Sequence, residues 1–416
     1  ALEALTDSQY NVGIGRQAAF KITTGDKNIS IGGGTLALAT TASNIIAIGH
    51  DAAYTVSAGN TASDGTIAIG ASALNALTTG AANTAVGFEA LKTEDAGPGN
   101  TALGYQALET LNNDDGYNVA IGHNAMQGAT TAYYNICIGK DTGTAMAAAV
   151  ASCVIIGHEA GDAISHTDAA GTIAIGRSAG GAITSGIGNV AIGYQALDAE
   201  DDGDFNTAIG YQALTAQTGT TGTVGNTAVG YRSGTAVTSG VHNTLLGYQA
   251  GLSQQTGGYN VAIGGNALVS EDTGTATIAI GYGAAYSQNY DGSSGTVVIG
   301  HNAGYHNVTG VNNTYLGKGS GLGASGQSNS YNTGVGASAL LAITTGGYNT
   351  AVGYQAGDSI TSGNSNVLIG RGTGVTMTEA DEMVLIGNDA GASINHATAA
   401  DGTVAVGYSA LAALTS

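Results

Sequence analysis

The stretch NVAIGYQALDAEDDGDFNTAIGYQAL, residues 189–214, contains nearly the same nine-residue sequence twice, and the two copies start 17 residues apart. When the chain is aligned on the glycine of "AIG", 23 copies follow one another between Gly15 and Gly407, most of them 17 residues apart. A tandem repeat this short has no core of its own. Stacked copies bury a continuous core, so the pattern predicts a solenoid in which each copy forms one turn.

The residue types around the aligned glycine, here called the repeat glycine, are nearly constant. The residue before it is Ile, Val or Leu, the third residue before it is β-branched, and Ala usually lies between them. This alternation predicts a short strand, and we expect its β-branched residues to be buried. The glycine provides a bend or a close approach of two backbones.

Asparagine occupies the fourth position before the repeat glycine in 15 copies. Stacked in register, these residues are expected to form a ladder in which each amide bonds the next. The structural repeat positions that we single out are Asn100, Asn118, Asn206, Asn226, Asn349, Gly104, Gly122, Gly193, Gly210, Gly230 and Gly353.

The repeat length sets the expected architecture. At about 3.3 Å per residue, 17 residues make one flattened turn of two short strands and two corners. Stacked at about 4.8 Å, 23 turns make a rod roughly 110 Å long. We therefore expect an all-β parallel β-solenoid over residues 1–416, a single continuous domain and a segment of a longer fibre. Insertions and acidic runs such as Glu200–Asp202 are expected to form a negatively charged edge.

Composition and charge exclude several classes of function. The net charge is −20 with only nine Lys and Arg residues, which argues against nucleic acid or an anionic membrane as a partner. No stretch of 18 apolar residues is present, so we expect no membrane insertion. No catalytic, cofactor or specific metal motif stands out, and we expect no enzyme activity, no cofactor and no metal site. Cys137 and Cys153 are expected to be free, buried thiols.

The position directly after the repeat glycine carries aromatic and basic residues in most copies. An exposed stripe of this kind can stack on sugars or on a receptor; alternatively, these residues cap an edge or meet acidic groups of a neighbouring chain. A second aromatic column precedes the asparagine, as at Tyr117, and corner packing is its expected role. The candidate binding residues of the first column are Tyr105, Tyr194, Tyr211, Tyr231, Tyr248, Tyr282, Tyr354, His123, His158, His301, Arg177 and Arg371.

The repeated sequence resembles the head repeats of trimeric autotransporter adhesins and related repeats of phage tail fibres. The copies that carry the resemblance include NTAVGFEAL (83–91), NTALGYQAL (100–108), NVAIGHNAM (118–126), NTAVGYRSG (226–234) and NTAVGYQAG (349–357). The resemblance implies a left-handed β-roll, three chains side by side in a homotrimer, and a role in attachment.

The resulting hypothesis is an extracellular structural and adhesive fibre, first of all the shaft or head of a phage tail fibre that attaches to a host. Its partners would be two further copies of the chain and a cell-surface receptor or glycan. A trimeric adhesin on a bacterial surface, or another extracellular filament, is the alternative. A glycan-degrading tailspike is a further alternative, and it would need a pair of carboxylates in a groove.

Overall fold

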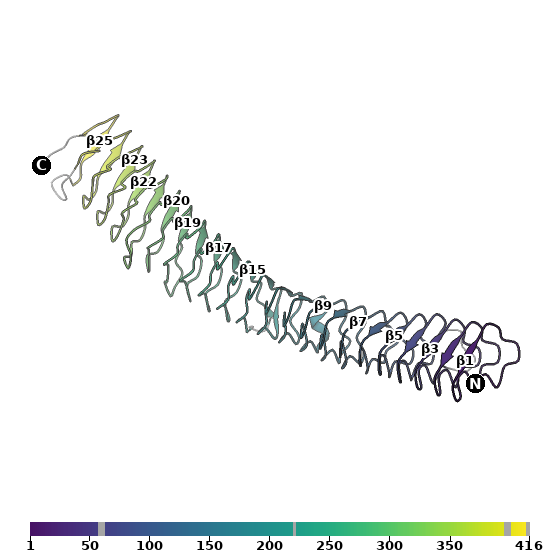
Figure 1. Ribbon diagram of the computed structural model, residues 1–416. Coiled ribbons are helices and arrows are strands. Elements are labelled where there is room, and N and C mark those ends of the chain that lie inside the picture. The colour runs from purple at the N-terminus through teal and green to yellow at the C-terminus, as the bar shows by residue number, and fades with distance from the viewer. Residues whose placement is uncertain (57–62, 219–221, 395–400, 413–416) are drawn as a thin grey trace. The chain divides into compact units, whose positions relative to one another are not determined.

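The computed structural model describes residues 1–56, 63–218, 222–394 and 401–412. The chain divides into two compact units, which we describe separately. The first comprises Ala1–Asn206 and Thr218–Gly222, and the second comprises Thr207–Gln217 and Thr223–Ser416. Each unit is a stack of parallel β-solenoid turns, so the expected fold class is confirmed for each (Figure 1). That residues 1–416 form one continuous domain stays a prediction.

The repeat strands have three residues each and end directly before a repeat glycine. In the first unit they are β1 (Val12–Ile14), β2 (Ile29–Ile31), β3 (Ile46–Ile48), β4 (Ile67–Ile69), β5 (Thr84–Val86), β6 (Thr101–Leu103), β7 (Val119–Ile121), β8 (Ile136–Ile138), β9 (Val154–Ile156), β10 (Ile173–Ile175) and β11 (Val190–Ile192). The short strand β12 (Gly203–Asp204) and a 3₁₀ turn, η1 (Thr167–Ala169), lie outside the repeat pattern.

The second unit continues the same pattern. Its repeat strands are β13 (Thr207–Ile209), β15 (Thr227–Val229), β16 (Thr244–Leu246), β17 (Val261–Ile263), β18 (Ile278–Ile280), β19 (Val297–Ile299), β20 (Thr314–Leu316), β21 (Thr333–Val335), β22 (Thr350–Val352), β23 (Val367–Ile369), β24 (Val384–Ile386) and β25 (Val404–Val406). The short strand β14 (Gly222–Thr223) falls at the boundary between the units.

Within each unit, successive repeat strands pair in parallel and without a register shift. Ala85 of β5 pairs with Ala102 of β6, and Ala102 pairs with Ala120 of β7. Each column of the repeat therefore becomes a straight row along the stack. The alignment by repeat glycines predicted this register, including across the longer steps such as Ile48 to Ile69.

The expectation of two strands per turn is wrong for the described residues. Apart from the two-residue strands β12 and β14, each repeat forms one strand, and most of the remaining residues lie in turns and bends. The turns contain recurrent left-handed residues, for example Gln106 (φ 51°), Leu108 (φ 53°) and Tyr117 (φ 59°). Non-glycine residues adopt this region only when surrounding contacts compensate its cost of about 1 kcal/mol or more per residue. Here the adjacent turns, which have the same conformation, supply those contacts.

The expectation that the β-branched residues are buried is also wrong. In β6 the central Ala102 is completely buried, whereas Thr101 is half-buried and Leu103 is 45% exposed. Because side chains alternate along a strand, either the central residue or the two flanking residues point inward. The interior is narrow and is already filled by Ala107 and Leu108 from the turn, so the inward position takes the small residue.

Interior volume is balanced between two positions of each turn. Seven described turns combine an inward Ala on the strand with Leu four residues after the repeat glycine, as with Ala102 and Leu108. Seven turns have a larger inward residue: Cys137, Ile155, Leu245, Val298, Tyr315, Leu368 and Leu385. In those seven turns the position four residues after the repeat glycine is itself glycine: Gly143, Gly161, Gly251, Gly304, Gly321, Gly374 and Gly391. In these turns a larger residue at one position thus accompanies the smallest residue at the other, as close packing requires. Where Ala and glycine occur together, as at Ala228 and Gly234, the side chain of Leu245 in the next turn occupies the space.

Both expected roles of the repeat glycine are confirmed. The repeat glycines have φ between 125° and 146°, a region that side chains disfavour. A Cβ atom on Gly247 would also lie 2.6 Å from the carbonyl oxygen of Gly264 in the next turn. Glycine is thus required both by the bend and by the contact between turns.

The asparagine row is confirmed as a ladder, with a bonding pattern that differs from the expected one. The side-chain oxygen of Asn100 accepts the backbone N–H of Asn118 in the next turn at 2.9 Å. The amide of Asn118 donates to the carbonyl oxygen of Ala132 at 2.9 Å, and Asn118 is completely buried. The row therefore bonds mainly from amide to backbone, although amides also bond directly, as between Asn366 and Asn349 at 2.8 Å.

The acidic runs do not form a uniformly exposed edge. Glu94, Glu200 and Glu271, each ten residues before a repeat glycine, are completely buried. Leu77 and Ile183 occupy the same position in other turns. The glutamate side chains turn inward because each closes a loop by accepting backbone N–H groups: Gly97 bonds Glu94 at 2.6 Å, Gly203 bonds Glu200 at 2.7 Å and Gly274 bonds Glu271 at 2.7 Å.

Burial makes these glutamates and the two thiols harder to ionise. It raises the pKa of all three glutamates, that of Glu271 to about 7. Cys137 and Cys153 are free and buried as expected, and burial raises the pKa of both thiols. Throughout the described ranges, the chain has no helix with the length and apolar character needed to cross a membrane.

Candidate functional site

The outward side of the repeat strands carries two parallel rows of apolar and β-branched side chains. On most strands the residues one and three positions before the repeat glycine are half-buried by their neighbours in the row. Several are more open, such as Leu103 at 45%, Leu246 at 44% and Leu316 at 45% exposure. We call these two rows the outer strand face. Open apolar surface of this extent is characteristic of an interface.

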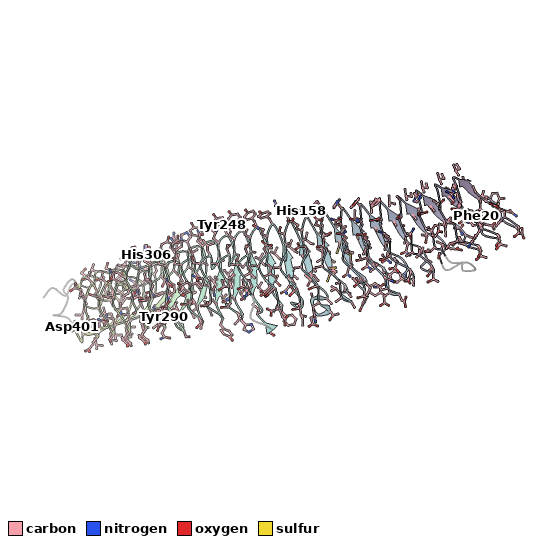
Figure 2. The ribbon with its side chains drawn as sticks, turned by 90° about the horizontal axis from the view of Figure 1, so that it is seen from below. Phe20, His158, Tyr248, Tyr290, His306 and Asp401 are labelled. Carbon is pink, nitrogen blue, oxygen red and sulfur yellow. The ribbon has the colours of Figure 1, made fainter. Side chains whose placement is uncertain are left out.

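The candidate binding residues lie beside the outer strand face, because they directly follow the repeat glycine. Figure 2 labels two of these residues, His158 in the first unit and Tyr248 in the second. Tyr194 and His158 are half-buried, and the other ten candidates are exposed: Tyr105, Tyr211, Tyr231, Tyr248, Tyr282, Tyr354, His123, His301, Arg177 and Arg371. We call this row the aromatic stripe.

Neighbouring rings of the aromatic stripe stack along the solenoid. In the first unit Phe88 stacks on Tyr105 at 5.3 Å between ring centroids, and Tyr105 stacks on His123 at 5.0 Å. In the second unit Tyr231 stacks on Tyr211 at 5.3 Å and on Tyr248 at 5.4 Å. Stacking fixes the rings as rigid, amphipathic surfaces, of the kind that suits a carbohydrate or another protein.

The basic residues of the aromatic stripe make local contacts. The Arg177 guanidinium lies 5.9 Å from the centre of the Tyr194 ring. Arg371 lies 3.5 Å from a carboxylate oxygen of Asp389 in the next turn, and His158 lies 3.3 Å from Glu159. These contacts fit the interpretation that basic residues meet acidic ones, here within the chain.

The second aromatic column borders the outer strand face on its other side. Tyr117 stacks on Tyr134 at 5.5 Å, and Tyr331 stacks on Tyr348 at 4.8 Å. These rings are 47–63% exposed, so they are not packed into a corner as expected. They occupy left-handed backbone positions, which direct the rings outward from the turn. Stacked rings therefore border the outer strand face on this side too, in the turns that carry these residues.

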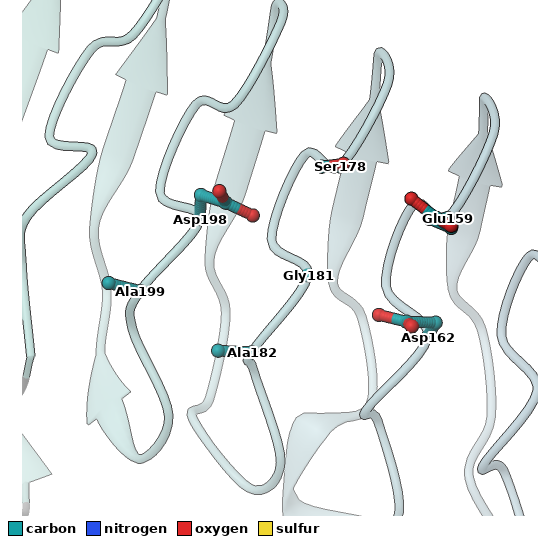
Figure 3. Close-up of a pocket in the computed structure, with 7 residues that line it drawn as sticks. All are labelled: Glu159, Asp162, Ser178, Gly181, Ala182, Asp198 and Ala199. Atoms are coloured by element: carbon teal, nitrogen blue, oxygen red, sulfur yellow. The ribbon is translucent and has the colours of Figure 1, made fainter.

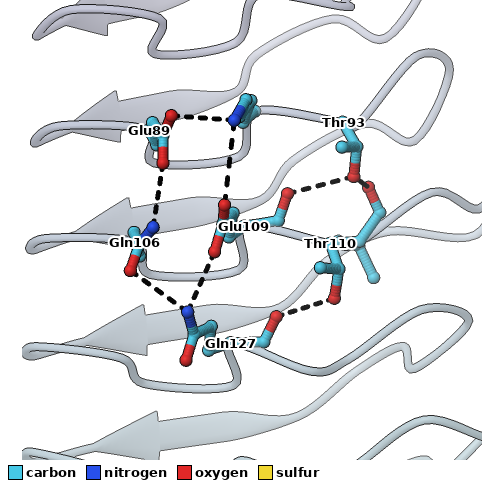
Figure 4. Close-up of polar contacts among 8 residues, drawn as sticks. Glu89, Thr93, Gln106, Glu109, Thr110 and Gln127 are labelled. Atoms are coloured by element: carbon cyan, nitrogen blue, oxygen red, sulfur yellow. Dashed lines mark hydrogen bonds and ion pairs between the residues drawn. The ribbon is translucent and has the colours of Figure 1, made fainter.

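A different surface of the turns, two and five residues after the repeat glycine, is polar in part of the first unit. In the first unit Lys92 bonds Glu89 at 2.7 Å, and Gln106 bonds the other oxygen of Glu89 at 2.8 Å (Figure 4). Gln127 then donates to Glu109 at 2.9 Å. In this region the acidic side chains are neutralised or hydrogen-bonded from turn to turn.

Further along the same polar surface, the acidic side chains surround a hollow. Its volume is about 380 Å³, and its lining includes Glu159, Asp162, Gly181 and Asp198. Figure 3 shows Asp162 and Asp198 on either side of the turn that contains Gly181. Burial raises the pKa of Asp162 and Asp198, and repulsion by Glu159 adds to both shifts. We call this feature the acidic hollow.

The sequence contained signals for these surfaces that the analysis of columns did not use. The hollow arises because glycine stands between two aspartates in one column, at positions 162, 181 and 198. The open outer strand face follows from the inward Ala, since a strand with small residues inside must place its large residues outside. Both signals require knowing which side of the strand faces inward.

Comparison of the chain with models of known protein families gives no match, and comparison with curated proteins gives no significant match.

Proposed function

We propose that the protein is a structural and adhesive fibre component, most simply the shaft or head of a phage tail fibre used in host attachment. The observation that carries the proposal is the outer strand face, which repeats from turn to turn and has stacked rings beside it in several groups of turns. The resemblance of the repeats to those of adhesins and tail fibres supports the same function. A repeated surface of this kind acts by multivalency, because many weak contacts add up along the stack.

The proposed partner for the outer strand face is the same face of two other copies, in a homotrimer. The face has a low content of charged residues, and apolar surface at about 25 cal/mol per Å² favours burial. The net charge of −20 is carried elsewhere, mainly on the turns, so it does not oppose association through the strands. The rings of the aromatic stripe would then lie at the borders between chains, where a receptor or glycan can reach them.

Immunogold electron microscopy with an antibody to the chain tests this function and its place outside the cell. Label on the tail fibres of virions is the expected result. Label on bacterial surfaces would favour the alternative, a trimeric adhesin or another extracellular filament. Label confined to the cell interior would contradict both.

A second function is favoured by the acidic hollow, namely cleavage of a host glycan by a tailspike. Glycosidases need two carboxyl groups about 5–10 Å apart, one of them with a raised pKa. Asp162 and Asp198 are the pair to test. Turnover of host polysaccharide that is lost in Asp162→Asn and in Asp198→Asn would support this function, and absence of turnover would exclude it.

A further inference from the structure

Three carboxylates of one loop in the first unit converge. One oxygen from each of Glu200, Asp201 and Asp202 lies within 4.8 Å of the others. Two oxygens that bind the same calcium ion, each at about 2.4 Å, are at most about 4.8 Å apart. The three side chains also extend from the interior to the surface, since Glu200 is buried, Asp202 is half-buried and Asp201 is exposed. An ion could therefore reach the cluster from solvent.

A second observation concerns the buried member of the cluster. Glu200 is completely buried, and its Oε2 atom has no hydrogen-bond partner. Glu94 shares this orphaned oxygen, but among the described residues only the Glu200 loop brings three carboxylates together. Its Oε1 atom is used by the loop, because it accepts the N–H groups of Gly203 at 2.7 Å and Asp201 at 3.1 Å. An orphaned, buried carboxylate oxygen is costly unless a proton or a cation satisfies it.

No positive charge of the described chain compensates this loop. No Lys, Arg or His among those residues forms an ion pair with Glu200, Asp201 or Asp202. Asp204 adds a fourth carboxylate to the loop and uses one oxygen to accept the N–H of Ile187 at 2.8 Å. Like charges this close repel each other strongly in a partly buried site.

The loop at Glu271 is a natural comparison within the same chain. Glu271 accepts the N–H of Gly274 at 2.7 Å, just as Glu200 accepts that of Gly203. Asp272 accepts the N–H of Thr273 at 2.8 Å, as Asp201 accepts that of Asp202 at 2.9 Å. The decisive difference is the next residue, which is Thr273 in one loop and Asp202 in the other. The Glu271 loop therefore closes without a carboxylate at this position. The Asp202 carboxylate is not needed to close the Glu200 loop and is available to bind a ligand.

We propose that the loop Glu200–Asp204 binds one calcium ion through the carboxylates of Glu200, Asp201 and Asp202. The oxygen ligands and their spacing suit a hard divalent cation, and water completes the six to eight ligands that calcium takes. Three side-chain ligands place the expected Kd at about 10⁻⁴–10⁻³ M, the range of extracellular calcium modules. The site reverses the expectation from sequence of no metal binding, and it does not depend on the proposed fibre function.

Isothermal titration calorimetry of the whole, chelator-treated chain with CaCl₂ in 0.15 M NaCl tests the proposal. The expected result is one calcium ion per chain. Asp202→Thr should weaken binding at least about tenfold, because it removes one charged ligand and recreates the loop found at Glu271. Glu200→Gln is a second variant that should weaken binding similarly, and Gln254 shows that the interior accepts glutamine at this position. Circular dichroism without calcium verifies that both variants fold.

Asp272→Asn is the matched control, because it removes one charge from the comparison loop, and it should leave calcium binding unchanged. Absence of binding by the unaltered chain would overturn the proposal. So would binding of several ions per chain with equal affinity in Asp202→Thr, since that result would indicate diffuse attraction to the negative surface. Loss of calcium binding in Asp272→Asn would show that the ion binds at the comparison loop of Glu271 and not at Glu200–Asp204. That result would also overturn the proposal.

Discussion

On the inner side of β6, the single small residue Ala102 is completely buried, whereas on its outer side Thr101 and Leu103 keep much of their surface open. The same contrast recurs on strand after strand. Inside, the chain satisfies its own packing: volumes balance within a turn, and buried amides bond the next turn. Outside, apolar residues are arranged as regularly but are only half-covered. Contacts between turns account for the inner side, whereas the half-covered outer side is the reason for our proposal that another molecule binds there.

The largest effect on this contrast is expected from the repeat glycines, on which the inner stacking depends. Gly247→Ala should lower the free energy of unfolding by about 4 kcal/mol or more, because the added Cβ would lie 2.6 Å from the Gly264 carbonyl oxygen at φ +140°. Chemical denaturation followed by circular dichroism measures the change. Gly171→Ala is the control: Gly171 also has a positive φ (80°), but its Cβ would meet no atom within 4 Å. Equal losses for the two variants would contradict the stacking role.

A double-mutant cycle should show whether the inward strand residue and the residue four positions after the repeat glycine share one interior volume. Leu245→Ala should cost about 3 kcal/mol by leaving a cavity. Gly251→Leu should also destabilise, because a Cβ there would lie 2.7 Å from Leu245 Cδ2. The double variant recreates the Ala and Leu pair of other turns, so it should recover most of the stability that each single variant loses. Additive losses, measured by denaturation, would show that the two positions do not share one volume.

The buried glutamates should make the inner side sensitive to pH. The pKa of Glu271 rises from 4.5 to about 7 on folding, so the folded chain holds the proton more tightly than the unfolded chain. The stability that this group contributes at low pH is therefore lost as pH rises from 4.5 through 7, by about 3 kcal/mol. Glu271→Gln should remove this dependence and become the more stable form above pH 7. Parallel stability profiles for the two proteins would contradict the account.

Charged residues introduced on the outer strand face should have little effect on the stability of a single chain. Leu246→Lys combined with Leu316→Lys should change the stability of the isolated fold by about 1 kcal/mol or less, because the two residues are 44% and 45% exposed and a lysine can extend into water there. The same pair of changes should abolish self-association, since buried, unpaired charges are costly at an interface. Gln249→Lys with Gln355→Lys adds the same charge away from this face and should leave association intact. A large loss of stability in the first pair would show that the face packs within the chain.

Much of the solenoid could be predicted from the columns of the sequence. The spacing of the repeat glycines predicted the parallel register. The close contact between repeat glycines of adjacent turns leaves no room for the Cβ atom that any other residue would add. Whether a side chain points inward or outward was harder to predict, because residues such as Thr101 and Leu103 are typical of buried strand positions. Only the volume already taken by Leu108 decides that Ala102 points inward. Similarly, Glu200 has the composition of a surface loop, and its burial depends on backbone N–H groups that the sequence does not reveal.

The candidate site was predicted in part. The exposed stripe at Tyr105 and Tyr231 followed from one column, and the structure places its rings in stacks. The acidic hollow and the cluster at Glu200–Asp202 were not predicted, because each depends on residues from adjacent turns or on the path of a loop. The sequence reveals which residue types recur at one position of the repeat. Which side chains of different positions lie close together is known only from the structure.

The native mass in solution, measured by sedimentation velocity, tests most directly whether the outer strand face is covered by copies of the same chain. The account predicts a species of about three times 40.5 kDa with a high frictional ratio for the unaltered chain, and a single chain for Leu246→Lys with Leu316→Lys. A stable, monodisperse 40.5 kDa species at micromolar concentration would contradict the account, because the apolar rows would then remain open to water.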